Sequence, residues 1–357
     1  MKILIDLTEL TDRPTGIPRV TENIARSMMK CFPEHEYVLI FYKQVSPSLA
    51  EEAAQNNVET IVLKENRKLM RLITLPAAMR NSDADWLICP AHPSPLLLND
   101  KRAVSVIHDL VPWKCPETML LKSMVKWRVL ISHAVKTNRY VLHVSNTVKQ
   151  EVEEEFHNHN SVAVCNGVDV PGEADNSVLE KYGLEKGKYI LSVATLEPRK
   201  NLKVLLEAFS KMEDHKGVKL VLSGGAGWKL KDAIGDLAEQ KDLILTGYVS
   251  DAELNGLYQN AKLFVSSSIY EGFGLPVIEA INNDVPVLIS DIPVYREITG
   301  GFAEYFPCRD SDALKDSLNC CMEKDIRTTK AYEQLREHVK QYTWENYVHK
   351  LNQLLTK

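Results

Sequence analysis

The sequence lacks any apolar run approaching the roughly 20 residues that a membrane-spanning helix needs. It also lacks an excess of basic residues: 43 Lys and Arg stand against 48 Asp and Glu, which argues against a protein that wraps nucleic acid. Its seven cysteines form no Cys-x-x-Cys pair, so neither a disulfide framework nor a zinc site is indicated. The start of the chain has no apolar core of a signal peptide. We therefore expect a protein of the cytoplasm with no nucleic-acid partner.

The glycine signatures of common nucleotide-cofactor folds are missing as well. Thr8 to Gly16 offers one glycine after the first predicted strand, so the Gly-x-Gly-x-x-Gly pattern of NAD- and FAD-dependent dehydrogenases is absent. The glycines of Ser223–Gly227 also follow an apolar run, but they lack the Gly-Lys-Ser or Gly-Lys-Thr ending of a P-loop. A turn or a minor nucleotide contact is favoured there over ATP hydrolysis, and we expect no cofactor.

Short runs rich in Val, Ile and Leu alternate with helical patterns along the chain, which is typical of α/β proteins with parallel sheets covered by helices. The length of 357 residues favours two domains. Each half carries enough runs for one doubly wound sheet. The runs are Ile3–Leu7, Tyr37–Phe41, Thr60–Leu63, Trp86–Cys89, Ala103–Ile107, Tyr140–Val144 and Val162–Cys165, then Tyr189–Val193, Lys219–Leu222, Leu243–Thr246, Leu263–Ser266 and Pro286–Ile289.

A cluster of turn-forming residues, Asn166–Gly172, separates the two sets of runs. We therefore predict an N-terminal Rossmann-like domain over residues 1–168 and a C-terminal one over residues 169–342. The last helical pattern, Trp344–Leu355, follows a complete second sheet and has apolar residues at helical spacing. The apolar face of this helix needs a surface to pack against, and we expect residues 343–357 to pack on the first domain.

The most informative segment, Ser266–Ala280, predicts a strand, a glycine loop and a helix in that order. Gly272 and Gly274 let the backbone approach a ligand closely, and the free N–H groups of a helix start favour negative charge. Pro276 suits the first helical turn, because an N–H group there would have no helical partner. Such a loop suits a diphosphate.

Two glutamates flank the glycine loop. Glu271 precedes it and Glu279 lies about a turn inside the predicted helix, so both can face one ligand. Carboxylates accept hydrogen bonds from vicinal hydroxyls, as an acid does at the ribose of dinucleotide sites. A lone glutamate here would be interpreted as a helix-dipole partner or a surface acid, but two around a glycine loop favour a ligand with hydroxyls.

The segment Glu271–Glu279 resembles the E-x7-E signature of retaining glycosyltransferases of family GT4, which have the GT-B fold. The similarity spans most of the chain, and the order and spacing of five further segments make it specific. These segments are Gly16–Arg19, His108–Asp109, Asn166–Asp169, Leu196–Asn201 and Thr246–Asp251. The resemblance implies two facing Rossmann-like domains, with the acceptor bound by the first, the nucleotide sugar by the second, and the donor in an interdomain cleft.

The resemblance also implies a role for each matching residue. Glu271 would bind hydroxyls of the transferred sugar, and Glu279 would bind the ribose of the nucleotide. Arg199 and Lys200 would neutralise the diphosphate leaving group, while His108 would touch the sugar or the acceptor. The remaining donor contacts would come from Gly16, Val249, Gly272, Phe273, Gly274 and Leu275.

One departure from the family pattern concerns Ala194–Leu196, where Gly-Arg-Leu is usual. Thr195 stands where a phosphate-binding arginine is expected. Arg199, next to Lys200, is expected to supply the missing charge.

The implied activity is retaining transfer of a hexose from a nucleotide sugar to a saccharide or lipid-linked saccharide acceptor. Fixed cations and backbone N–H groups can stabilise a diphosphate leaving group, so no bivalent metal is required. Similarity to bacterial polysaccharide and lipopolysaccharide mannosyltransferases favours GDP-mannose as the donor. The alternatives are a UDP-sugar-dependent transferase of the same fold, a non-hydrolysing nucleotide-sugar epimerase, and a non-catalytic nucleotide-sugar-binding protein.

Two acidic pairs, Asp83 with Asp85 and Asp310 with Asp312, have the spacing of an Asp-x-Asp metal site. The first pair precedes a predicted strand and the second opens a predicted helix, where acids act as caps. We interpret both as structural and expect no metal site.

His108 ends an apolar strand, and because strand C-termini face the ligand in open α/β sheets, this position favours function over packing.

Residues 64–139 carry 13 Lys and Arg against 6 Asp and Glu, which makes a basic region within an acidic chain. The surplus includes Arg67, Lys68 and Arg71. It favours either a surface for anionic lipid or phosphate, or ordinary solvated helix faces. The first interpretation predicts peripheral association with the inner face of the membrane.

Overall fold

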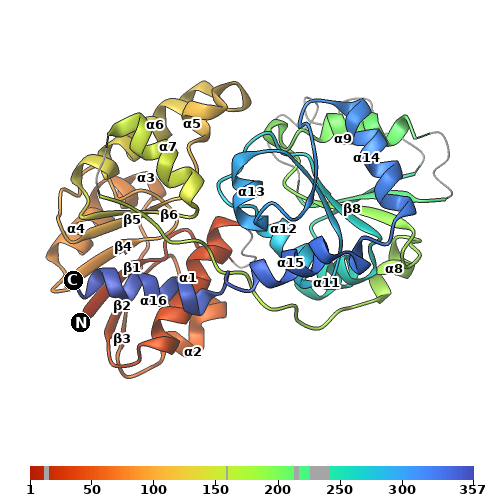
Figure 1. The fold of residues 1–357 in the computed structure, drawn as a ribbon. Helices are drawn as coiled ribbons and strands as arrows, with labels where there is room; N and C mark the ends of the chain where they lie inside the picture. The colour runs from red at the N-terminus through yellow and green to blue at the C-terminus, as the bar shows by residue number, and fades with distance from the viewer. Residues whose placement is uncertain (12–15, 158–159, 213–216, 226–241) are drawn as a thin grey trace. The chain divides into compact units, whose positions relative to one another are not determined.

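The computed structural model describes residues 1–11, 16–157, 160–212, 217–225 and 242–357. The chain divides into two compact units, each built on its own sheet (Figure 1). The first unit comprises Met1–Gly167 and Tyr342–Lys357, and the second comprises Val168–Gln341.

The sheet of the first unit has seven parallel strands in the order β3-β2-β1-β4-β5-β6-β7. Every apolar run expected to form a strand in this half does so, which confirms the predicted parallel α/β arrangement. The strands are β1 Lys2–Asp6, β2 Glu36–Tyr42, β3 Val58–Leu63, β4 Trp86–Cys89, β5 Ala103–Ile107, β6 Tyr140–His143 and β7 Ser161–Ala163. The helices are α1 Ile17–Cys31, α2 Ala50–Ala53, α3 Arg67–Leu69 with a π-helical turn Met70–Thr74, α4 Leu75–Asn81, α5 Val111–Lys114, α6 Leu121–Thr137, α7 Asn146–Phe156 and α16 Trp344–Leu355.

Successive side chains of β2 point to opposite faces of this sheet, because side chains alternate along a strand. Val38 and Ile40 belong to one apolar cluster with Met70 and residues of α4. Tyr37 points the other way, and its hydroxyl donates to the Met28 carbonyl of α1 at 2.8 Å. Because both faces are covered, the inner strands are mostly apolar runs and not alternating ones, whereas the edge strand β3 has Glu59 and Thr60 exposed.

The C-terminal helix α16 packs beside α1 in the first unit (Figure 1). The indole of Trp86 in β4 donates to the carbonyl of Leu355 at 2.9 Å. At the other end of the helix, a Cβ on Gly167 would lie 2.2 Å from the backbone nitrogen of Trp344. The absence of a side chain at Gly167, where the chain leaves the first unit, therefore allows its backbone to lie against Trp344, where the chain has returned to that unit.

The sheet of the second unit has six parallel strands in the order β10-β9-β8-β11-β12-β13. Five were expected from the apolar runs. The sixth, β13, has one buried residue among its three, which explains why the apolar pattern missed it. The strands are β8 Tyr189–Val193, β9 Lys219–Ser223, β10 Leu243–Gly247, β11 Leu263–Ser266, β12 Val287–Ser290 and β13 Glu304–Phe306. The helices are α8 Ser177–Lys181, α9 Leu202–Ser210, α11 Asp251–Asn260, α12 Leu275–Asn282, α13 Pro293–Thr299, α14 Ser311–Glu323 and α15 Lys330–Val339.

Strand order reverses once in each sheet, between β1 and β4 in the first unit and between β8 and β11 in the second. In open α/β sheets, ligands bind outside the carboxyl ends of the strands at such a switch point. The fold therefore marks one edge position in each unit where functional side chains are expected.

Candidate functional site

The turn after β8 and the loop after β11 meet at the switch point of the second sheet. The amide of Ile269 donates to the carbonyl of Arg199 at 3.0 Å, and the Ser267 hydroxyl donates to the carbonyl of Lys200 at 2.8 Å. These contacts fix both basic residues beside the loop that leads to the predicted glycine motif.

Glu271 lies at the centre of this arrangement with 8% of its surface exposed. Its Oε1 accepts hydrogen bonds from Lys200 Nζ and Ser268 Oγ, both at 2.6 Å, and its Oε2 accepts one from Arg199 Nη1 at 2.7 Å. Arg199 also donates through Nη2 to Glu197 Oε1 at 2.6 Å. The structure thus brings together three of the predicted site residues, Glu271, Arg199 and Lys200, in one ion-paired group.

The Glu271 carboxyl is ionised at neutral pH. Burial alone raises its pKa, but the charges of Arg199 and Lys200 outweigh burial and lower the pKa to about 2. The nearby Tyr295 hydroxyl pairs with Ser266 at 2.6 Å, and burial followed by the charge of Glu271 raises the pKa of this phenol. The site therefore holds a fixed negative charge beside two cations that can also face a phosphate.

Gly274 ends the loop and immediately precedes α12. Its φ of 105° lies in the left-handed region, and a Cβ there would lie 2.7 Å from a ring carbon of Tyr295. Gly272 and Phe273 are buried, and Leu275 begins the helix. The predicted order of strand, glycine loop and helix is confirmed, and a second reason for glycine, the close approach of Tyr295, is added.

Glu279 lies in α12 and is half-buried. Its Oε2 accepts a hydrogen bond from the Tyr258 hydroxyl of α11 at 3.1 Å. That hydroxyl also lies 3.4 Å from the carbonyl of Pro276. Glu279 is thus oriented by a residue of α11, whereas Glu271 is held by residues that follow β8 and β11. Different elements therefore position the two carboxylates.

Val249 lies in the turn between β10 and α11. Its side chain is 7% exposed, while the ring-bearing residue before it, Tyr248, is 46% exposed. Ser250 caps α11 through a reciprocal pair of bonds with Glu253. Because the Val249 side chain belongs to the core, its predicted donor contact can only be made by its backbone.

The backbones after β8, β9 and β10 lie close together at the same edge of the sheet. A Cβ on Gly224 would lie 2.1 Å from the carbonyl oxygen of Ala194, and the Gly224 amide donates to the Gly247 carbonyl at 3.0 Å. Thr195, which stands where the family has an arginine, is exposed. The rest of the glycine-rich stretch, residues 226–227, lies outside the described residues.

Two predicted site residues belong to the first unit. His108 follows β5, and its Nε2 donates to the carbonyl of Pro90 at 2.7 Å, which leaves Nδ1 as the acceptor nitrogen of a neutral ring. Burial lowers the pKa of His108, so the ring is neutral at pH 7. Gly16 is exposed at the N-terminus of α1, with a φ of 57°.

The two acidic pairs have structural partners. Asp83 forms an ion pair with Lys2 Nζ at 2.6 Å, and Asp85 accepts a hydrogen bond from the Lys2 amide at 2.8 Å. Asp310 caps α14 by accepting from the amides of Asp312 and Ala313. Within the described part of the chain, no three His, Cys, Asp or Glu side chains gather as metal ligands.

Comparison with known proteins identifies the family. Residues 176–343 match the family Glycosyl transferases group 1. The chain is 30% identical over 259 residues to O-antigen chain mannosyltransferase B of Escherichia coli, which covers 69% of this chain and 68% of that protein. It is 29% identical over 237 residues to O-antigen chain mannosyltransferase RfbU of Salmonella typhimurium, which covers 65% of this chain and 64% of that protein. The chain belongs to the group 1 glycosyltransferases.

Solved structures support the same fold for this glycosyltransferase. HepE of Anabaena, determined in complex with UDP and glucose, has a TM-score of 0.76 at 17% identity, over 100% of this chain and 99% of that one. WaaG, a glycosyltransferase involved in lipopolysaccharide biosynthesis, has a TM-score of 0.74 at 13% identity, over 99% of both chains. With a parallel sheet in each unit, the enzyme has the predicted GT-B fold.

The glycosyltransferase has a second charged cluster that sequence reasoning missed, at the switch point of the first sheet. The Glu9 carboxylate binds the guanidinium groups of Arg67 and Arg71 and lies 3.4 Å from His92 Nε2. No motif marks these residues, because they come from separate segments after β1, β3 and β4. The only local signal was their position just beyond predicted strands.

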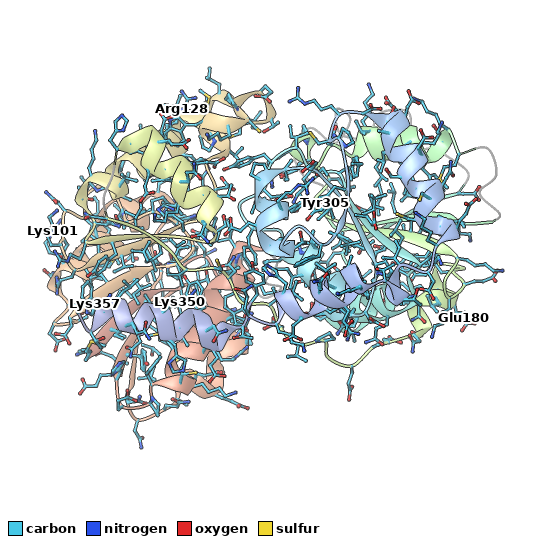
Figure 2. The ribbon with its side chains drawn as sticks, in the orientation of Figure 1. Lys101, Arg128, Glu180, Tyr305, Lys350 and Lys357 are labelled. Carbon is cyan, nitrogen blue, oxygen red and sulfur yellow. The ribbon has the colours of Figure 1, made fainter. Side chains whose placement is uncertain are left out.

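Large apolar side chains are exposed mainly in the first unit, around α3, α6 and the segment before β5. Arg128 of α6 is labelled in Figure 2. Its Nε donates to the Pro112 carbonyl at 3.0 Å and its guanidinium lies over the Trp113 ring, so it anchors that side of α6 to α5. No helix of the described residues is long and apolar enough to cross a membrane. The exposed apolar side chains of this unit are Leu69, Leu72, Ile73, Leu96, Leu97, Leu120, Leu121, Val125 and Val129.

Proposed function

We propose that this glycosyltransferase moves a mannosyl residue from GDP-mannose to a saccharide or lipid-linked saccharide, with retention of configuration and without a bound metal. The observation that carries the proposal is the Glu271 carboxylate, ionised and held between Lys200 and Arg199 at the switch point of the second sheet. The two mannosyltransferases to which the chain is similar support the choice of sugar.

Glu271 is assigned to the hydroxyls of the transferred sugar, because an ionised carboxylate only accepts hydrogen bonds and a sugar ring offers donors. Lys200 has two N–H groups beyond the one directed at Glu271, and with Arg199 it stabilises the charge that develops on the departing diphosphate. The bond from the anomeric carbon to the phosphate oxygen breaks as the acceptor oxygen bonds to that carbon from the same face. The acceptor proton passes to the departing phosphate oxygen.

Glu279 is assigned to the ribose of the donor, and its support by Tyr258 favours one fixed orientation for its carboxylate. The start of α12, with Gly272 and Gly274 before it, is assigned to the diphosphate, since free N–H groups and the helix dipole favour an anion. The Val249 backbone is assigned to the base. In the first unit, neutral His108 is assigned to the acceptor side.

Peripheral association with an anionic membrane surface is part of this proposal. Leu121, Val125 and Val129 recur every four residues along one exposed face of α6, with Lys122 and Lys126 beside them. An exposed apolar stripe flanked by lysines matches the chemistry of an interface that is apolar inside and negatively charged at its surface. Such contact would bring the enzyme to a lipid-linked acceptor.

A UDP-sugar is the second candidate donor, favoured by the UDP that HepE binds. A thermal-shift screen with GDP, UDP, ADP, dTDP and their sugars separates the two, because a ligand of the native state raises the unfolding midpoint. GDP and GDP-mannose should raise it most. A larger rise with UDP-sugars would replace the proposed donor, and no rise with any nucleotide sugar would overturn the assignment of this site.

Product analysis tests the rest of the proposal. The anomeric configuration of the product, measured by NMR, should be that of the donor, and activity should survive EDTA. An inverted product would refute retention, and activity lost with EDTA but restored by Mn²⁺ or Mg²⁺ would refute metal independence. Interconversion of two nucleotide sugars without an acceptor would instead identify an epimerase, and binding without any turnover would identify a non-catalytic binding protein.

A further inference from the structure

The first unit has a charged cluster at the position where open α/β sheets bind ligands. Glu9 follows β1, and His92 follows β4, the two strands between which the order of the sheet reverses. Arg67 and Arg71 reach the same point from the segment after β3. The cluster thus occupies in the first unit the place that Glu271, Lys200 and Arg199 occupy in the second.

Positive charge exceeds negative charge within this cluster. One carboxylate, Glu9, receives both Arg67 and Arg71, and Arg71 Nε lies 3.2 Å from Glu9 Oε1. Lys126 of α6 adds a third cation, because its Nζ lies 5.0 Å from the centre of the Trp127 ring, which meets the ring of His92. Burial lowers the pKa of Lys126, the positive charge of Arg71 lowers it further, and Arg67 adds to the effect while Glu9 opposes it. Three cations around one carboxylate repel each other, and a bound anion would relieve that repulsion.

The cluster keeps part of its hydrogen-bonding capacity accessible. The Arg67 side chain is 56% exposed, whereas Arg71 is 20% exposed and Glu9 is 13% exposed, so Arg67 keeps the cluster open to solvent. The Nδ1 atom of His92 is buried, and it has no hydrogen-bond partner among the described residues. A buried polar atom without a partner is uncommon in a native structure, so the His92 side of the cluster is incompletely hydrogen-bonded.

Aromatic rings line the same cluster. The His92 and Trp127 rings meet edge to face with centroids 4.8 Å apart, and the Arg67 guanidinium lies 5.8 Å from the centre of the Tyr42 ring. Cationic groups beside aromatic rings suit a ligand that joins an anion to a ring with apolar C–H faces.

We propose that Arg67, Arg71, Lys126 and His92 form a subsite for a phosphoryl group of the saccharide acceptor, with Trp127 beside the attached sugar. The assignment of the ligand as the acceptor rests on the proposed glycosyltransferase function; the binding of a phosphoryl anion does not. The phosphoryl group belongs either to a soluble sugar phosphate or to the diphosphate of a lipid-linked saccharide. The exposed Leu69 and Leu72, on the same helical segment as the arginines, are placed to contact a lipid chain.

The test follows the indole N–H signal of Trp127 by NMR, assigned with Trp127→Phe, during titration with inorganic pyrophosphate and with farnesyl diphosphate. Both probes should shift this signal in the parent protein. Arg71→Gln should weaken the response to both by about tenfold or more, since a charge-assisted hydrogen bond to the anion is lost. Arg67→Gln, at a more exposed position, gives a second measurement in case Arg71→Gln unfolds. Lys68→Gln, which removes the same charge from the same helix outside the cluster, is the matched control.

The outcomes separate this inference from the proposed function. A Trp127 signal that neither probe moves, or equal responses from the parent and both arginine variants, would overturn the subsite. Tighter binding of farnesyl diphosphate than of pyrophosphate assigns the subsite to a lipid-linked acceptor, and equal binding assigns it to a soluble sugar phosphate. The NMR titration needs no nucleotide sugar. If the donor screen fails but the titration succeeds, the anion subsite is retained and only the proposed glycosyltransferase reaction is rejected.

Discussion

Lys200 Nζ lies 2.6 Å from Glu271 Oε1, although 71 positions separate the two residues in the chain. The contact exists because β8 pairs with β11, which brings the turn after one strand against the loop after the other. In the proposed mechanism Lys200 serves the diphosphate and Glu271 the sugar. In that mechanism, the diphosphate side of the breaking bond would contact Lys200 and the sugar side would contact Glu271, and these two residues bind each other.

Glu271→Gln should leave the affinity for free GDP nearly unchanged and lower kcat by about 100-fold or more, because contacts to the sugar matter most as it becomes cationic in the transition state. Calorimetry with GDP and kinetics with GDP-mannose measure the two quantities. Glu197→Gln is the matched control, since it removes a buried carboxylate from the other side of Arg199. An equal fall in kcat for both variants would mean that Glu271 acts only by positioning Arg199.

Glu279→Gln should weaken GDP and GDP-mannose alike, by about tenfold, because both carry the ribose and a charged acceptor is lost. Tyr258→Phe removes the hydroxyl that orients Glu279 and should weaken both ligands in the same direction but less. Calorimetry with each ligand provides the comparison. If Glu271→Gln abolishes GDP binding while Glu279→Gln leaves it intact, the two roles are reversed.

The ion pairs of Glu271 should make stability depend on acidity. The pKa of Glu271 in the folded state is about 2, below its ordinary value of 4.5, so its stabilising effect is fully present above 4.5 and is lost as the pH falls through about 2. Urea unfolding should show a stability difference between the parent and Glu271→Gln that is constant near neutral pH and shrinks in acid. Glu304→Gln, on β13, controls for general charge effects. A difference that stays constant down to about pH 2 would show that the carboxylate is not preferentially stabilised in the fold.

Gly274→Ala should destabilise the second unit by more than Gly301→Ala. Both positions have positive φ, 105° and 82°, and the strain of placing alanine there costs on the order of 1 kcal/mol. Only at Gly274 would the new Cβ also meet the Tyr295 ring, at 2.7 Å, whereas nothing lies within 4 Å at Gly301. Denaturant unfolding measures the two losses. Equal losses would mean that Tyr295 yields without cost.

Replacing Val125 and Val129 together by Asp should reduce binding of the enzyme to vesicles containing phosphatidylglycerol, because it places negative charge in the apolar stripe of α6. Added salt should also weaken binding, by screening the lysines. Val170→Asp, at a valine of the second unit that is 87% exposed, is the control for adding acid to an exposed apolar position. Vesicle cosedimentation measures all three proteins, and equal binding would remove α6 from the membrane proposal.

The local sequence was enough to predict most of the fold. The apolar runs predicted twelve of the strands, because strands covered on both faces of a parallel sheet are largely apolar. It missed β13 at the edge of the sheet, which is three residues long and has only one buried residue. The glycine loop before α12 was predictable for a different local reason, because Gly274 allows the positive φ before the helix and Pro276 suits its first turn.

The side-chain partners were decided by tertiary structure. The family resemblance implied a diphosphate role for Arg199 and Lys200, but that both also bind Glu271 follows from the pairing of β8 with β11. Arg67 and Arg71 counted only as part of a basic region until the fold placed Glu9 beside them. Sequence patterns determine which segments become strands and loops, because those depend on near neighbours. Strand order determines which loops meet, and no periodicity along the chain encodes the partner of a charge that lies dozens of residues away.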